Sequence, residues 1–91
     1  MDDLSEGLGR VTAELEYTEG LVLALPDGVD DERSDLALSL ARANGQVRLV
    51  HTLYRLGSYS VDATVAVLVA AESIVTATRD RLAELVPAPL A

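Results

Sequence analysis

Residues 36–54 read LALSLARANGQVRLVHTLY, and two structures compete for this stretch. The Asn44–Gly45 pair is a strong signal for a β-hairpin turn, and its flanks alternate tolerably between apolar and polar residues. Apolar residues also recur every three or four positions straight through Gly45, at Leu36, Leu40, Ala43, Val47, Val50 and Tyr54. A hairpin turn at Gly45 would not require the apolar residues on its two flanks to share one helical spacing. The stretch therefore predicts one helix, in which Gly45 marks a kink or a close helix crossing.

The segments on either side carry the same helical spacing. Before Pro26 it is unbroken, at Leu4, Leu8, Val11, Leu15, Thr18, Val22 and Leu25. After Ser60 the same spacing continues, but two of its positions, Glu72 and Arg79, are polar. The series is Val61, Val65, Leu68, Glu72, Val75, Arg79, Leu82 and Val86. We expect Leu68 to face the core together with Val61 and Val75. Three stripes of similar length predict three packed helices.

Turn residues separate these segments. Pro26 and Gly28 interrupt the first stripe, and the acidic residues 30–32 supply N-cap candidates and a first helical turn. Gly57 has the position of a helix C-cap, and Ser58 or Ser60 can cap the next helix. The sequence predicts an all-α, antiparallel three-helix bundle with helices at about 3–25, 30–57 and 60–86. These form one domain, 1–86, followed by a short Pro-containing tail, 87–91.

Composition excludes several classes of function. The chain has no Cys and one His, which removes thiolate metal sites and leaves no basis for a metal or a cofactor. It has no Phe or Trp, so Leu, Val and Ala must build the core. A net charge of −8 argues against nucleic-acid binding. All seven basic residues are Arg, which is typical of a GC-rich bacterial genome.

The sequence also favours a cytoplasmic protein that binds no membrane. Its first residues are acidic, whereas a secretory signal begins with basic residues and an apolar run. The stretch from Ala63 to Ala71 carries no charge, but it is about half of the roughly 20 residues that span a bilayer. We expect it to be a buried part of the third helix.

A basic stripe stands out in this acidic chain. Residues 36–57 hold three arginines and no acidic residue, and Arg48, His51 and Arg55 share one side of the predicted helix. We predict that these three residues bind carboxylates. One source is the first helix of the same chain or of a second copy, which carries Glu6, Glu14, Glu16 and Glu19. The alternative is a docking edge for an acidic partner helix.

No catalytic set is recognisable, and the prediction is that the protein is not an enzyme. Arg48 stands three residues before His51, where a di-iron bundle would need Glu, and no Gly-x-Ser-x-Gly pattern occurs. In being a small helical bundle with an Arg-flanked His, the chain is similar to histidine phosphotransfer domains, which implies phosphoryl transfer to His51. Those domains follow the His with Lys-Gly, whereas this chain continues Thr52-Leu53-Tyr54-Arg55.

The third predicted helix is apolar on every side between Val65 and Ala71. One bundle covers only part of such a helix, so we expect homo-oligomers, with Val69 at the interface. The sequence thus favours a non-enzymatic protein–protein interaction module, such as an adaptor, an assembly subunit or an inhibitor. Its length and helices are also similar to the WXG-type proteins of type VII secretion systems, although it lacks their Trp. Its size and charge would equally suit an acidic antitoxin or immunity protein.

Overall fold

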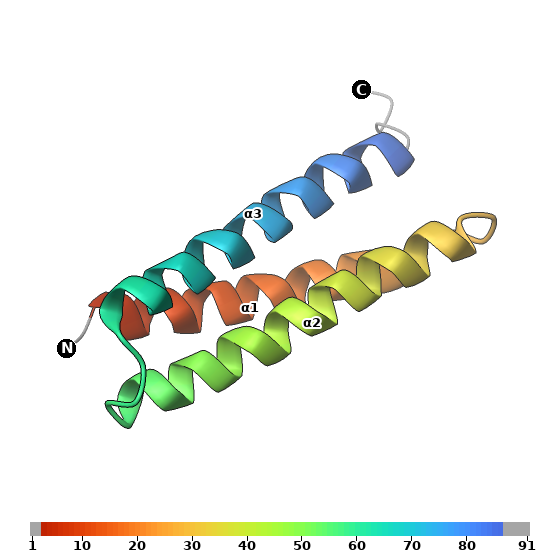
Figure 1. Ribbon diagram of the computed structural model, residues 1–91. Coiled ribbons are helices and arrows are strands. Elements are labelled where there is room, and N and C mark those ends of the chain that lie inside the picture. The colour runs from red at the N-terminus through yellow and green to blue at the C-terminus, as the bar shows by residue number, and fades with distance from the viewer. Residues whose placement is uncertain (1–2, 87–91) are drawn as a thin grey trace.

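The computed structural model describes residues 3–86, and these form three helices and no strand. Helix α1 spans Asp3–Leu23, α2 spans Asp30–Arg55 and α3 spans Val61–Leu85, and each helix packs against the other two. Successive helices run in opposite directions, as Figure 1 shows. The predicted antiparallel three-helix bundle is therefore confirmed, with every boundary within two residues of its expected place. The hairpin alternative at Asn44–Gly45 is wrong, because α2 runs through it.

Local chemistry explains where α2 ends and α3 begins. Gly57 has a φ of 77°, a left-handed conformation in which a side chain is disfavoured. Its N–H donates to the Tyr54 carbonyl at 3.0 Å, and the Ser58 N–H donates to the Leu53 carbonyl at 2.8 Å. These two bonds make a Schellman motif, which satisfies carbonyls at the helix end. Ser60 then caps α3, since its Oγ accepts from the Ala63 N–H at 3.1 Å.

The turn between α1 and α2 is held by an arginine that the sequence did not single out. Nη2 of Arg33 donates to the carbonyls of Leu25 and Pro26 at 2.8 and 2.7 Å, and its Nη1 pairs with Asp30. The N-cap position of α2 is Val29, which makes no side-chain cap. The acidic residues 30–32 therefore form the first turn, as expected, but none of them is the cap. Arg33 instead satisfies carbonyls that follow α1.

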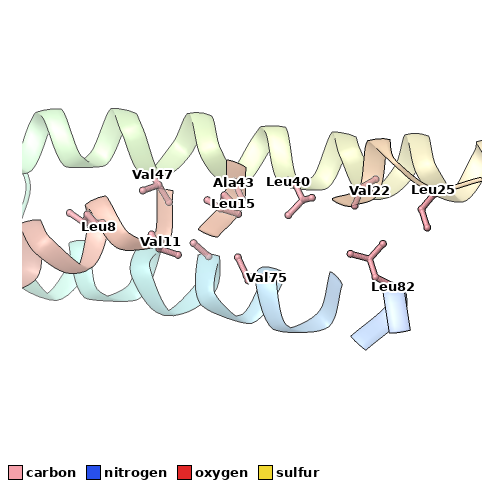
Figure 2. Packing of buried hydrophobic residues seen from close by; sticks show 11 residues of the cluster. Leu8, Val11, Leu15, Val22, Leu25, Leu40, Ala43, Val47, Val75 and Leu82 are labelled. Carbon is pink, nitrogen blue, oxygen red and sulfur yellow. The ribbon is translucent and has the colours of Figure 1, made fainter. Parts of the chain in front are cut away.

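The core confirms the predicted stripes of α1 and α2. In the first stripe, every member from Leu8 to Leu25 is buried, and Leu4 is half-buried; Leu25 lies just after the end of α1. In α2, the four central members are buried, while Leu36 and Tyr54 are partly buried against them. Figure 2 shows the resulting apolar cluster, with side chains of all three helices directed into it. Aliphatic side chains thus hold α1 and α2 together along their length.

The predicted stripe of α3 is wrong at most positions. Val75 and Leu82 are buried as expected and Leu68 is half-buried, but Val61 is 57% exposed. The helix instead turns a more polar stripe inward, made of Thr64, Leu68, Ala71, Val75, Thr78 and Leu82. Among the glycines, Gly7 is the one that lies close to another helix, since an added Cβ there would lie 3.2 Å from Cδ2 of Leu68.

Candidate interaction surfaces

The basic stripe lies on α2 without an intrachain partner. Arg48 and Arg55 are exposed and His51 is half-buried. None of the ion pairs found in residues 3–86 includes any of the three, so the expected pairing with carboxylates of α1 is not seen within one chain. The side chains of Arg48 and Arg55 are therefore exposed to solvent and take part in no ion pair found in residues 3–86.

Other arginines hold the helices to one another. Arg81 on α3 donates from Nε to Oε1 of Glu32 on α2 at 2.7 Å, and from Nη1 to Oε2 of Glu84 at 2.6 Å. These hydrogen bonds, that to Glu32 first, raise the pKa of Arg81 above its ordinary value. Arg79 lies over the ring of Tyr17 on α1, with 5.8 Å between its Cζ and the ring centroid. Both arginines of α3 are thus directed toward neighbouring helices.

Large aliphatic side chains lie on the solvent side of α2. Leu38 is 51%, Leu49 60% and Leu56 72% exposed. They belong to a second stripe with helical spacing, opposite the core stripe, that runs one residue past the helix end. We call it the α2 outer face, and it consists of Leu38, Arg42, Gly45, Leu49, Thr52 and Leu56, all exposed.

Gly45 does not have the role that its sequence position suggested. A Cβ added there would meet no atom within 4 Å, so no helix of the same chain crosses at this point. The predicted close crossing is therefore absent at Gly45 within the bundle, whereas a Cβ added at Gly7 would lie near the side chain of Leu68 on α3.

The solvent side of α3 is apolar and acidic. Val65 is 41% and Val69 55% exposed, which agrees with the outward position expected for Val69. We define the α3 outer face as Asp62, Val65, Val69, Glu72, Thr76 and Asp80, which are all exposed and three or four residues apart. A shallow depression of about 420 Å³ lies on this face, lined by Val69, Glu72, Ser73, Thr76, Ala77 and Asp80.

Two further features complete the candidate sites. An apolar groove of about 490 Å³ lies between the ends of α1 and α3, lined by Leu21, Ala24, Leu25, Arg79, Leu82, Ala83 and Val86.

Helix α3 is also long and apolar enough to cross a membrane, and only 22% of its most apolar 18-residue window is buried. One such helix is weak evidence for a membrane protein, because core helices of soluble proteins meet the same criterion. Within residues 3–86, no group of three His, Asp or Glu side chains is placed to hold a metal ion.

The structure does not bring the predicted interaction residues together. Arg48, His51 and Arg55 lie on α2, whereas Val69 lies on α3, on a separate surface. The sequence prediction missed the exposed leucines of α2, although their second stripe with helical spacing was a detectable signal. Comparisons with protein families, with curated proteins and with solved structures found no match.

Proposed function

We propose that this chain is a non-enzymatic helical interaction module that acts as a homo-oligomer, with the α3 outer face as one of its contact surfaces. The observation that carries the proposal is the orientation of α3. This helix buries Thr64, Ala71 and Thr78 while it leaves Val61, Val65 and Val69 in solvent.

A helix gains stability by burying its largest apolar side chains, and each buried Val contributes roughly 1.5–3 kcal/mol relative to an exposed one. In the single bundle, α3 forgoes that contribution at three valines. A partner on the α3 outer face would recover it at Val65 and Val69. Contiguous exposed apolar surface of this kind is typical of protein–protein contact sites.

The test replaces Val69 by a charged residue. The wild type should exceed its monomer mass of 9.6 kDa in light scattering at physiological ionic strength. Val69→Glu should bring the mass down to that of the monomer and keep the helical circular dichroism, because an unpaired charge at a buried contact costs several kcal/mol. The matched control is Leu23→Glu. Leu23 is similarly exposed but lies on α1, so its change of charge should leave the mass unaltered.

Two results would contradict the proposal. The first is a wild type that stays at 9.6 kDa at every concentration. The second is such a monomer sedimenting with vesicles of phosphatidylcholine and phosphatidylserine, which would mean that lipid covers α3. An assembly that Val69→Glu leaves intact would show that copies meet elsewhere.

A further inference from the structure

We infer that the α3 outer face of one copy packs against the α2 outer face of a second copy, so that copies join head to tail through two different surfaces. The inference rests on the proposed function, and it deepens that function by naming the surface that α3 binds. The acidic helix predicted to dock on α2 is then α3 of another copy of this chain.

Charge complementarity is the first argument. The α2 outer face includes Arg42 and is bordered by Arg48 and Arg55, and residues 36–57 contain no acidic residue. The α3 outer face carries Asp62, Glu72 and Asp80, and none of the ion pairs found in residues 3–86 uses these three carboxylates. Three cations thus face outward on one helix and three anions on another.

The arginines of α3 do not neutralise those carboxylates. Arg81 is held by Glu32 and Glu84, and Arg79 lies over Tyr17. Two α3 outer faces in contact would therefore set acid against acid, and two α2 outer faces would set Arg against Arg. Like charges placed together are unfavourable, so charge selects the mixed contact between α2 and α3.

The shapes of the two faces also fit. Val69, Glu72, Ser73 and Thr76 line the depression on α3, and they stand at positions i, i+3, i+4 and i+7. That set is the four-residue hole which receives one side chain when helices pack knobs into holes. Ser73 and Thr76 are small, so the hole has room for a leucine. Leu49 is central on the α2 outer face and 60% exposed, which makes it the fitting knob.

Seating Leu49 in this hole aligns the charges. In nearly antiparallel helices, Arg48 then lies on the same side of the contact as Glu72, whereas in parallel helices the two residues lie on opposite sides. Asp80 meets Arg55 if the helices are parallel and Arg42 if they are antiparallel. The antiparallel orientation therefore gives two ion pairs beside the apolar contact, and the parallel orientation gives one.

The mixed contact also accounts for Gly45. A glycine inside a helix is unfavourable by roughly 0.5–1 kcal/mol relative to Ala, and no atom of the same bundle takes the space above it. Gly45 lies one helical turn before Leu49 on the α2 outer face. A second helix could approach the backbone of α2 closely there, as the sequence position of Gly45 had suggested for a helix crossing.

A contact between two different surfaces leaves one free surface of each kind on every dimer. Such assemblies grow into open chains unless their geometry closes them into a ring. The mass of the wild type should therefore rise beyond that of a dimer as the concentration increases, either steadily or to a fixed value.

The decisive experiment mixes two variants, each with one broken face. Leu49→Glu breaks the α2 outer face and Val69→Glu breaks the α3 outer face. Each variant alone should have the monomer mass, since every contact needs one face of each kind. Mixed in equal amounts they should form a dimer of twice that mass, because the intact α3 outer face of one fits the intact α2 outer face of the other.

A charge exchange tests the same contact if either glutamate variant fails to fold. Arg48→Glu and Glu72→Arg should each lower the mass of the assembly, and the two changes in one chain should restore it. Arg10→Glu is the matched control, since it makes the same change of charge on the exposed side of α1. It should leave the mass as in the wild type.

The outcomes separate this inference from the proposed function. If Val69→Glu is monomeric while Leu49→Glu assembles like the wild type, α3 is a contact surface but α2 is not its partner, and this inference is overturned. If both variants stay monomeric when mixed, the two faces do not bind each other, and it is overturned as well. A wild type that is monomeric at every concentration would overturn both.

Discussion

Helices α1 and α3 differ in the side chains that they direct into the core. Helix α1 directs Leu8, Val11 and Leu15 into the core, and Gly9 and Ala13 are among its exposed residues. Helix α3 directs Thr64 and Thr78 inward and leaves valines in solvent. The overall apolar content of a helix therefore does not reveal which side of it is buried. The difference teaches that α1 places its regular aliphatic stripe in the core, whereas α3 fills much of its inward side with small or polar side chains.

Truncating a leucine of α1 should give the largest effect. Leu15 is fully buried, so Leu15→Ala should lower the free energy of unfolding by about 2–5 kcal/mol, through lost burial and the cavity it leaves. Leu23→Ala, at an exposed position of the same helix, should change it by less than about 0.5 kcal/mol. Urea denaturation at one fixed protein concentration measures both. Equal effects of the two substitutions would contradict the placement of Leu15 in the core and of Leu23 on the solvent side of α1.

The N-cap of α3 should have an intermediate effect. Ser60 Oγ accepts the hydrogen bond of the Ala63 N–H, and removing such a cap typically costs about 1 kcal/mol. Ser60→Ala should therefore destabilise the fold by about that amount, and Ser60→Asp, which keeps an acceptor, should retain most of the stability. Thermal denaturation followed by circular dichroism compares the three proteins. An unchanged midpoint in Ser60→Ala would show that the stability of α3 in the bundle does not depend on this N-cap.

Two glycines of α1 should give the smallest effect and probe the contact with α3. Gly9→Ala should stabilise the fold by roughly 0.5–1 kcal/mol, since nothing lies near the added Cβ. Gly7→Ala gains the same helix propensity but must displace the end of Leu68, which lies 3.2 Å from that Cβ. Its gain should therefore be smaller. Urea denaturation of the two variants side by side checks the order, and a larger gain at position 7 would contradict the close approach of α1 and α3.

The same contrast explains how far the sequence could predict this structure. The stripes of α1 and α2 are aliphatic at nearly every inward position, so their spacing alone identified the core. The inward stripe of α3 contains Thr64, Ala71 and Thr78, which carry little apolar signal, whereas Val61 and Val65 carry a strong one and point outward. The predicted stripe of α3 is therefore rotated away from the observed one, and the two share only Leu68, Val75 and Leu82.

The remaining misses have local causes. The bonds from Arg33 to the carbonyls of Leu25 and Pro26 depend on the path of the turn, which no spacing rule encodes. Among the candidate site residues, Val69 was placed correctly on the solvent side of α3, because an all-round apolar segment must expose one side. The α2 outer face was not predicted, because its leucines stand among basic and small residues. The sequence prediction on this helix rested on the basic stripe beside them.

The odd number of helices has a mechanical consequence. A bundle with an even number of antiparallel helices brings its first and last residues to the same end, whereas here α1 begins and α3 ends at opposite ends of the bundle (Figure 1). At 1.5 Å per residue, the 25 residues of α3 keep these ends about 37 Å apart. Fluorescent labels at Ser5 and Glu84 would measure the distance between these two ends.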